Sequence, residues 1–270
     1  MPELPEVETS RRGIEPHIID ATISRVVIRE RRLRWPVSKD VDHNLPGQTI
    51  LSVGRRAKYL LINTATGTAI LHLGMSGSVC MVDRGTPAGV HDHVDIEFES
   101  GLMLRFRDPR RFGSLHWSTS PLSHPLLRPL GPEPLGDEFD GHYLWQKSRG
   151  RKVSIKQFIM NAHIVVGVGN IYASESLFMA GIHPRRAAGR IARQRYDALA
   201  DAIKDVLSKA IRAGGTTLRD FYGGDGEAGY FQQQLEAYGR EDEPCRRCNT
   251  PITAIVQGQR STYYCKTCQT

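Results

Sequence analysis

Strict alternation of apolar and polar side chains marks a β-hairpin in the first half of the chain. Residues 94–98, Val-Asp-Ile-Glu-Phe, alternate at every position, and a Ser-Gly turn separates them from an apolar run at residues 102–106. This period is typical of antiparallel strands with one buried face and one face in water. β-Branched and other apolar side chains predict three more strands, at residues 21–29, 58–64 and 68–73. We therefore expect an antiparallel β-sandwich with one helix at its start.

After residue 130 the apolar positions recur with the period of a helix. Residues 130–136, Leu-Gly-Pro-Glu-Pro-Leu-Gly, have no periodicity, and such a Pro/Gly-rich stretch is a natural domain boundary. Helices are expected at residues 153–162, 170–180 and 190–213, and a Gly-Gly pair follows the last of them as a stop signal. Because strands come first and helices second, the pattern indicates the α+β class.

These changes of pattern divide the chain into four segments. We expect a sandwich domain at residues 1–130, a linker at 131–150, a helical domain at 151–239 and a short cysteine-containing segment at 240–270. Within the helical domain, residues 216–239 are rich in glycine and carry several aromatic side chains. A loop of this length inside a compact domain is usually functional or without fixed structure.

Composition adds an anionic partner to this picture. Lys and Arg total 36 against 29 Asp and Glu, which gives a net charge of +7 and an isoelectric point near 9.3. Such a surplus suits binding to nucleic acid, above all because the arginines cluster along the chain. The sequence has no apolar run long enough to span a membrane, and its acidic start differs from a signal peptide. We expect a soluble intracellular protein.

Four of the five cysteines form two Cys-x-x-Cys pairs near the end of the chain. The pairs are Cys245 with Cys248 and Cys265 with Cys268, separated by 16 residues. Two such knuckles at this spacing match a structural zinc ribbon with four thiolate ligands. Two disulfides are the alternative, which the absence of a secretion signal disfavours. The fifth cysteine, Cys80, lies in an apolar strand and is expected to be a buried thiol.

The segment between the two cysteine pairs predicts a rigid, projecting β-hairpin. Its strands are expected at residues 252–256 and 261–264, with Arg260 at the tip. A hairpin of this kind can deliver an arginine into a groove of nucleic acid. The plain alternative is a solvated arginine in a turn.

The first residues of the chain carry candidate covalent chemistry. Removal of the initiator methionine would leave Pro2 with a free secondary amine, and an α-amino group titrates near pH ~8. Such an amine can attack a sugar aldehyde or its equivalent and form a cationic iminium. Glu3 is placed to supply or remove protons at the carbon under attack. The alternative is a frayed acidic terminus.

Two further motifs suit phosphate or base contacts. Gly167 and Gly169 precede Asn170 at a helix start, where exposed amides bind phosphate, although two glycines also fit a simple tight turn. Residues 107–113 combine three arginines with Phe112, whose ring can wedge between bases. Alternatively, Phe112 is the first core residue of a strand.

Taken together, these motifs resemble the bacterial formamidopyrimidine-DNA glycosylases, which remove oxidised purines and nick the strand. The resemblance runs along the whole chain through PELPEVE, RRAKYLL, HLGMSG, HDHVD, DPRRFG, LGPEPL, VGVGNIYASE and the four-cysteine ribbon. It implies a β-sandwich followed by a helix-two-turn-helix domain and a zinc finger with one structural Zn²⁺. It also implies that the partner is double-stranded DNA with oxidised bases or abasic sites, bound by a monomer in the bacterial cytoplasm.

The resemblance also assigns roles to single residues. Pro2 is the Schiff-base nucleophile, Glu3 the proton donor for base loss, Lys58 the proton donor in β-elimination and Arg260 the proton donor in δ-elimination. A second group fills the gap left by the everted nucleotide or contacts DNA. Its members are Met75, His91, Arg110, Phe112, Arg151, Lys156 and Asn170.

Two other functions remain open from the sequence. A glycosylase of the endonuclease VIII type prefers oxidised pyrimidines, but that branch typically carries glycine where this chain has Leu4. A non-catalytic DNA-binding module would need only the zinc hairpin and the basic surface. The chain departs from common family patterns at Asn161 and Ala162 and at Ala228, which leaves the lesion preference open.

Overall fold

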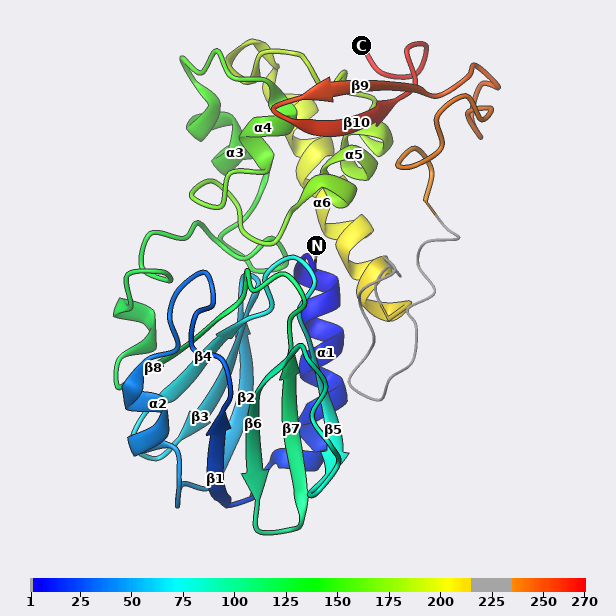
Figure 1. Cartoon of the computed structure of the whole chain (residues 1–270). Coiled ribbons are helices and arrows are strands. Elements are labelled where there is room, and N and C mark those ends of the chain that lie inside the picture. Colours follow the sequence, from blue (N-terminus) through cyan, green and yellow to red (C-terminus); the bar gives the residue numbers. More distant parts are fainter. Residues whose placement is uncertain (1, 215–234) are drawn as a thin grey trace. The chain divides into compact units, whose positions relative to one another are not determined.

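The computed structural model describes residues 2–214 and 235–270, which form two compact units (Figure 1). Unit 1 contains residues 2–128 and 213–214, and unit 2 contains residues 129–212 and 235–270. Most of the glycine-rich loop expected at 216–239 lies outside the described residues.

Unit 1 is built from two four-stranded antiparallel sheets. The first has the strand order β1-β6-β7-β5 and the second the order β2-β3-β4-β8. The strands of the first sheet are β1 (Ile23–Ile28), β6 (Asp92–Phe98), β7 (Leu102–Arg107) and β5 (Ser78–Asp83). Those of the second are β2 (Ile50–Arg56), β3 (Tyr59–Thr64), β4 (Thr68–His72) and β8 (Ser114–Ser118).

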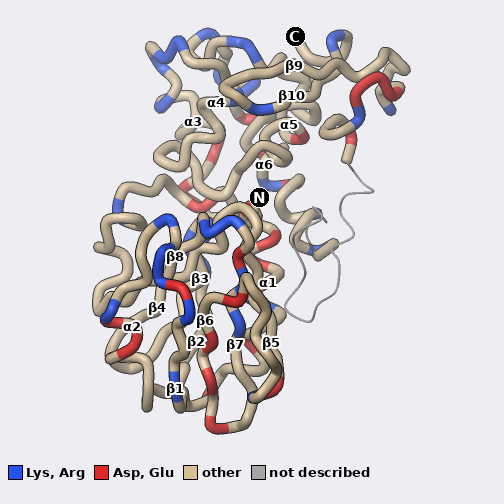
Figure 2. Tube along the Cα trace, viewed as in Figure 1, with Lys and Arg blue, Asp and Glu red and all other residues tan. Residues whose placement is uncertain are grey.

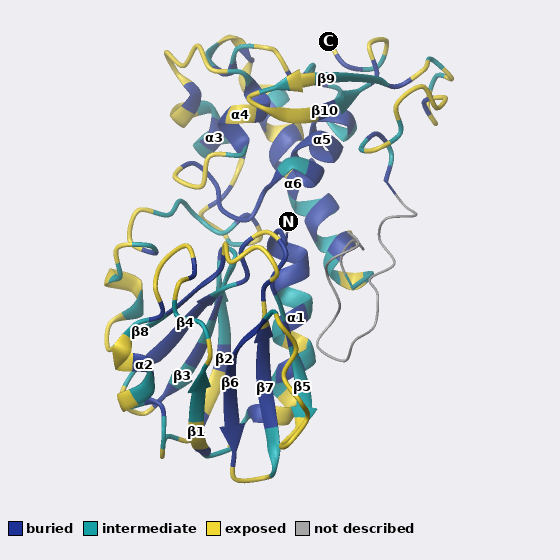
Figure 3. Ribbon diagram, in the orientation of Figure 1, coloured by how far each residue is buried: buried dark blue, intermediate teal, exposed yellow. Residues whose placement is uncertain are grey.

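Alternating side chains of the two sheets meet in one core, which confirms the predicted sandwich. Val94 and Ile96 of β6 share this core with Leu60 and Ile62 of β3. Figure 3 shows β6 as buried along its length. The opposite face of β6 differs from the expectation of a face in water, because Asp95 is fully buried. Its carboxylate accepts hydrogen bonds from Arg29 at 2.6 Å and from Arg105 at 2.9 Å, and these ion pairs replace its contact with water.

Two helices close the open sides of the sandwich. Helix α1 (Leu4–Ile18) packs against β2 and β5, which are edge strands of the two different sheets. Helix α2 (Lys39–Asn44) packs against β8 and β1, the two remaining edge strands. The apolar side of α1, including Val7, Ile14 and Ile18, enters the common core. The first residues of the chain are therefore anchored to the sandwich by a buried helix.

Unit 2 is mainly helical. Its helices are α3 (Gly141–Ser148), α4 (Ile155–Ile159), α5 (Asn170–Met179) and α6 (Arg193–Arg212), with the short 3-10 turn η2 (Ala188–Arg190). A further 3-10 turn, η1 (Pro121–Ser123), belongs to unit 1. Helix α6 packs against α3 and α5. As predicted, it buries the stripe formed by Leu199, Ile203, Val206, Leu207 and Ala210. Helix α3 lies within residues 131–150, the stretch that the sequence predicts to be a linker.

A two-stranded hairpin completes unit 2. Strands β9 (Thr253–Gln257) and β10 (Arg260–Tyr264) are joined by Gly258 and Gln259, whose φ angles are 56° and 61°. Two residues with positive φ are the signature of a type I′ turn, which matches the natural twist of antiparallel strands. No helix among the described residues is long and apolar enough to span a membrane.

Candidate functional site

The start of α1 holds the two residues expected to carry the chemistry. Glu3 is the N-cap of α1 and forms a capping box with Glu6, whose Oε2 accepts a hydrogen bond of 2.8 Å from the backbone N–H of Glu3. Pro2 and Glu3 are both buried, with 2% of Glu3 exposed. Pro5 suits the first turn because no intrahelical amide bond is required there. This terminus is therefore ordered, unlike the frayed end that the sequence left open.

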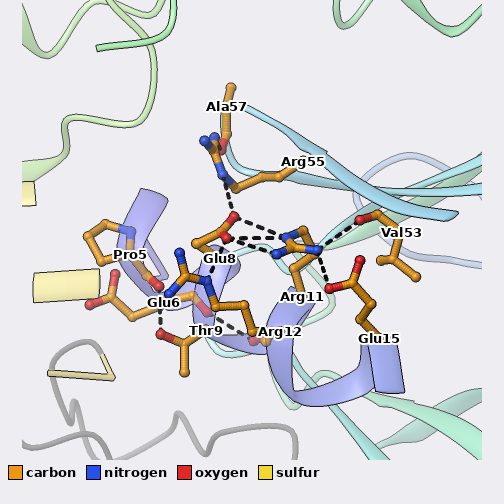
Figure 4. A network of polar contacts seen from close by, with 11 residues as sticks. Pro5, Glu6, Glu8, Thr9, Arg11, Arg12, Glu15, Val53, Arg55 and Ala57 are labelled. Atoms are coloured by element: carbon orange, nitrogen blue, oxygen red, sulfur yellow. Dashed lines mark hydrogen bonds and ion pairs between the residues drawn. The ribbon is translucent and has the colours of Figure 1, made fainter. Parts of the chain in front are cut away.

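A carboxylate one turn further along ties α1 to the β2–β3 turn (Figure 4). Glu8 forms ion pairs with Arg11 at 3.1 Å, with Arg12 at 2.8 Å and with Arg55 of β2 at 3.2 Å. Burial alone would raise the pKa of Glu8. Hydrogen bonds from Arg11 and Arg12, with the charges of Arg11 and Arg55, outweigh burial and lower that pKa. Glu8 is thus charged at neutral pH.

Arg55 carries this link to the residue before Lys58. Its Nη1 donates a hydrogen bond of 2.8 Å to the carbonyl of Ala57, whose φ of 56° lies in the left-handed region (Figure 4). An alanine in that region is strained, so an interaction that fixes its carbonyl also fixes the turn. Lys58 is the next residue and is half-buried. The structure therefore connects the helix of Pro2 and Glu3 to the turn of Lys58 through Glu8 and Arg55.

His72 and Arg34 lie near Lys58 and were not singled out from the sequence. The His72 ring packs 4.7 Å from the ring of Tyr59, centroid to centroid. Burial, followed by the positive charges of Lys58 and Arg34, lowers the pKa of His72 to about 4. Its Nδ1 accepts a 3.0 Å hydrogen bond from the backbone N–H of Gly74, which leaves the ring proton on Nε2. His72 is the first residue of the motif HLGMSG, and Arg34 lies in the basic run RRLRWP. Both stretches could have drawn attention to these residues.

Met75, Arg110 and Phe112 lie on two loops whose backbones are in contact. A Cβ atom added to Gly74 would lie 2.5 Å from the backbone of Phe112 and of Gly113, so only glycine allows this approach. Met75 and Phe112 are exposed at 36% and 37%, and the Arg110 guanidinium lies 4.9 Å from the centroid of the Phe112 ring. Phe112 precedes β8 and is not a core residue. The structure thus brings these three side chains together on one exposed edge.

His91 lies on a third loop beside these two. Its carbonyl accepts a 2.9 Å hydrogen bond from the backbone N–H of Asp108, and its side chain is half-buried. The loops that present Met75, His91 and Arg110 are therefore linked through Asp108.

In unit 2, Asn170 begins α5 and is held by two other elements. Its Oδ1 accepts a 2.7 Å hydrogen bond from Lys156 of α4, and its Nδ2 donates one of 3.0 Å to the carbonyl of Ser261 in β10. A longer contact of 3.4 Å joins Nδ2 to the hydroxyl of Tyr238. Asn170 is thus fixed in orientation at the glycine-rich start of the helix. Tyr238 was not singled out from the sequence.

Lys156 is an interior residue of unit 2, with only 1% of its surface exposed. Its ammonium group donates to Asn170 at 2.7 Å, to the hydroxyl of Thr262 at 2.8 Å and to the carbonyl of Ser261 at 3.2 Å. An ammonium group has three donors, so these contacts engage it with three separate acceptors. The geometry therefore makes Lys156 a cross-link among α4, α5 and the hairpin.

Arg151 and Arg260 are exposed, in contrast to Lys156. Arg260 is the first residue of β10, directly after the type I′ turn. Arg151 belongs to a basic run that begins in the last turn of α3 and continues into the segment before α4. Figure 2 shows Lys and Arg in blue along the chain. The members of this run are Lys147, Arg149, Arg151 and Lys152. Both arginines are accessible to an anionic partner.

The four cysteines at the base of the hairpin form one cluster. Their sulfur atoms all lie within 4.8 Å of one another, with 3.9 Å between Cys245 and Cys268 and 3.5 Å between Cys248 and Cys265. Tetrahedral Zn²⁺ with Zn–S bonds near 2.3 Å separates its sulfurs by roughly 3.8 Å, so the cluster fits this ion. The cluster packs on a small apolar core of Phe178, Ala237 and Ile252. Four thiolates leave no open position, which makes the site structural.

Three family models together match most of the chain. The formamidopyrimidine-DNA glycosylase N-terminal domain matches residues 1–115, and the formamidopyrimidine-DNA glycosylase H2TH domain matches residues 130–222. The zinc finger found in FPG and IleRS matches residues 242–270, which include the cysteine cluster.

Full-length relatives and solved structures agree with these matches. The formamidopyrimidine-DNA glycosylases of Pseudomonas entomophila and Pseudomonas putida are 61% and 62% identical, over 100% of both chains. The Lactococcus lactis Fpg bound to DNA with an abasic site has a TM-score of 0.91 at 33% identity, covering 99% of both chains. The FPG protein of Thermus thermophilus has a TM-score of 0.90 at 34% identity, covering 99% of this chain and 98% of its own.

Proposed function

Because the chain belongs to the formamidopyrimidine-DNA glycosylase family, we propose that it removes oxidised purines from double-stranded DNA and then cleaves the abasic strand. The observation that carries this proposal is the ordered Pro2-Glu3 terminus, linked through Glu8 and Arg55 to the turn of Lys58. That arrangement supplies an amine nucleophile and proton-transfer groups from one rigid unit. Among the similar proteins, a Lactococcus lactis structure contains a Fapy-dG DNA, which favours a purine lesion.

Access to the lesion is the first step. A damaged base inside the duplex cannot be reached, so its nucleotide is everted at a cost of a few kcal/mol. Met75, Arg110 and Phe112 fill the resulting gap, and the Phe112 ring replaces part of the lost base stacking. His91 contacts the DNA backbone beside them. The exposure of Met75 and Phe112 supports this role, since exposed apolar side chains next to a cation suit a stack of bases.

The chemistry then proceeds through a covalent intermediate. The Pro2 nitrogen attacks C1′ of the sugar, and the glycosidic bond breaks with its electron pair on the departing base, which takes up a proton managed by Glu3. Ring opening gives an iminium between Pro2 and C1′, and its positive charge acidifies the protons on C2′. Loss of one C2′ proton expels the 3′-phosphate by β-elimination. A second elimination expels the 5′-phosphate and leaves a one-nucleotide gap.

Lys58 and Arg260 serve the two eliminations as proton donors. Lys58 lies on the turn fixed by Arg55, and Arg260 lies at the tip of a stiff hairpin, so each cation has a defined position within its own unit. His72 remains uncharged at physiological pH because burial and the charge of Lys58 keep its pKa near 4, so its Nε2–H can donate to a phosphate without adding charge.

Unit 2 supplies further DNA contacts. Asn170 at the start of α5 and the exposed Arg151 bind phosphates, because helix N-termini and arginines are the usual donors to them. Lys156 contributes by holding Asn170 and the hairpin rather than by touching DNA. The zinc ion fixes the base of the hairpin. The enzyme acts as a monomer on chromosomal DNA in the bacterial cytoplasm.

Borohydride trapping tests the proposal directly. The wild type is incubated with a duplex carrying 8-oxoguanine opposite cytosine and with a matched dihydrothymine duplex, and each reaction is compared with Pro2→Gly. We expect a covalent adduct on the oxoguanine strand that is strongly weakened in the variant. Predominant trapping on dihydrothymine would instead favour the pyrimidine branch. Tight binding without any adduct would overturn the lyase mechanism and leave a DNA-binding protein.

A further inference from the structure

Asp108 is a buried carboxylate at the meeting point of three loops, and none of the chemistry above uses it. The residue is fully buried at 0% exposure. Its Oδ1 accepts hydrogen bonds from the hydroxyl of Ser76 at 3.0 Å and from the backbone N–H of Arg110 at 3.3 Å. Its Oδ2 accepts one of 2.8 Å from the backbone N–H of Gly113. One carboxylate therefore binds the neighbours of Met75, Arg110 and Phe112.

The backbone of Asp108 holds the third loop. Its N–H donates to the carbonyl of His91 at 2.9 Å, and its carbonyl accepts from Nε2 of His93 at 2.8 Å. His93 is itself 97% buried, because only 3% of it is exposed. The loops at residues 73–77 and 108–113 and the start of β6 at residues 91–93 thus converge on one residue.

The shape of the 108–113 loop makes these hydrogen bonds necessary. Arg111, between Arg110 and Phe112, has a φ of 57°, a left-handed conformation that arginine rarely adopts. The carboxylate holds the backbone N–H of Arg110 before this strained residue and that of Gly113 after it. The N–H of Arg111 donates in addition to the Asp108 carbonyl at 3.2 Å. Without the carboxylate, the loop is free to relax toward an ordinary conformation and to move both side chains.

We infer that Asp108 is the positioning residue of the gap-filling group, fixing the spacing of Met75, Arg110 and Phe112 before DNA arrives. The inference rests on the proposed role of these three side chains. A preformed group enters the duplex without first having to be ordered, so Asp108 affects only reactions in which a nucleotide must be everted from a duplex. A purely structural carboxylate would affect all reactions of the enzyme alike.

The test compares two substrates that differ in the need for eversion. One is a duplex with 8-oxoguanine opposite cytosine, and the other is a single-stranded oligonucleotide with an abasic site. Single-turnover cleavage of both is measured for the wild type, Asp108→Asn, Ser76→Ala and Phe112→Ala. Asp83→Asn is the matched control, because Asp83 is an exposed aspartate at the end of β5. Thermal unfolding is recorded for every variant.

Asp108→Asn replaces one acceptor oxygen by a donor and so leaves a buried N–H of the loop without its partner. We expect duplex cleavage to fall about tenfold or more, while cleavage of the single strand changes less than about twofold. Ser76→Ala removes the hydroxyl that donates to Asp108 and also accepts from the backbone N–H of Arg110 at 3.3 Å, but it keeps the carboxylate. It should show a smaller loss with the same preference for the duplex. With 2-aminopurine placed next to the lesion, the eversion signal of both variants should be slower.

Three outcomes would overturn the inference. An equal fall on both substrates in Asp108→Asn and Ser76→Ala would show a general structural role. Unchanged duplex cleavage in those variants, with a loss in Phe112→Ala, would show that the group needs no such support. Unchanged duplex cleavage in Phe112→Ala would remove the proposed role of the group itself, whatever Asp108 does, while the borohydride adduct at Pro2 would still stand.

Discussion

In unit 1, three shielded carboxylates connect separate segments of the chain through ion pairs and hydrogen bonds. Glu8 joins α1 to Arg55, Asp95 joins Arg29, which follows β1, to Arg105 of β7, and Asp108 joins three segments. Each carboxylate is well shielded from water and is met by several donors, which is the condition under which a buried charge is tolerated. Removing one such partner leaves the others buried and unsatisfied. Substitutions at this scale therefore have effects beyond the residue replaced.

The Glu8→Gln variant tests the link between α1 and the turn of Lys58. It removes the charge that Arg11, Arg12 and Arg55 share, and we expect it to lower the free energy of unfolding by about 2–4 kcal/mol, as for a partly buried ion pair that loses one partner. Urea denaturation at pH 7 measures this loss. Glu15→Gln, which affects a more exposed partner of Arg11, is the control with a smaller effect.

The pH dependence of the same variant has a definite sign. The folded pKa of Glu8 lies below its ordinary value of 4.5, so its contribution to stability is present above pH 4.5 and is lost as the pH falls through the folded value. The stability difference between wild type and Glu8→Gln should therefore shrink on acidification below pH 4.5. A difference that stayed constant from pH 7 to pH 3 would contradict the assigned network.

His72 gives a second pH prediction with a different window. Its pKa is near 4 in the folded protein against an ordinary value of 6.5, so the unfolded chain takes up a proton first as the pH falls. The resulting destabilisation begins below pH 6.5 and is complete near pH 4. His72→Gln should flatten the decline of the unfolding temperature across this window, relative to wild type. His17→Gln, which removes an exposed histidine at the end of α1, is the comparison variant.

At the scale of elements, the sequence predicted those helices and strands that have a clear periodic pattern of apolar residues. The alternation at 94–98 and 102–106 becomes β6 and β7, and the helical stripe at 190–213 becomes α6. Helix α3 was not predicted because its eight residues are too few to establish a period, although Asp140 caps it with a 2.7 Å hydrogen bond to the N–H of Tyr143. The apolar strand expected around Cys80 is β5, but the Cys80 thiol is only half-buried, because its side of this edge strand is not fully covered.

The residues of the candidate site also divide into those that the sequence predicted and those that only the structure revealed. Pro2, Glu3 and the cysteines were named from the chemistry of their residue types and spacing, whereas Lys58 was named only from the resemblance to the glycosylase family. The cross-linking roles of Glu8, Asp108 and Lys156 depend on partners far away in the chain, such as Ser261 for Lys156. No local pattern encodes such pairs. The same is true of the lowered pKa of His72, which follows from the proximity of Lys58 and Arg34.

In unit 2, Lys156 joins α4 to α5 and to the β9–β10 hairpin through its hydrogen bonds. Lys156→Met keeps the apolar stem but removes the donors to Asn170, Ser261 and Thr262. We expect a loss of about 2–4 kcal/mol in stability and weaker binding to abasic duplex DNA, with zinc content unchanged. Chemical denaturation, fluorescence anisotropy and metal analysis measure the three quantities. The exposed Lys209→Met, in α6, is the control and should change none of them.

At the scale of the whole molecule, the zinc site stabilises the β9–β10 hairpin, and a separate apolar core stabilises the sandwich. Among the described residues, the cysteine cluster packs on the small core of Phe178, Ala237 and Ile252, whereas the sandwich has a large core of its own. A chelator or Cys265→Ala should therefore abolish cleavage of duplex DNA and the order of the hairpin while leaving the sandwich folded. Hydrogen exchange followed by mass spectrometry separates the two: slow amides in β6 and β7 should persist, and those in β9 and β10 should become fast.

Each of the four edge strands of the sandwich lies against α1 or α2, and α1 is also the helix that carries Pro2 and Glu3. An uncovered strand edge is a template for pairing with another chain. Detachment of α1 on heating would therefore displace Pro2, the proposed nucleophile, and expose β2 and β5 in the same event. Thermal inactivation and the onset of aggregation are coupled in such an architecture, so an enzyme sample that has lost its activity through heat will also be one that precipitates.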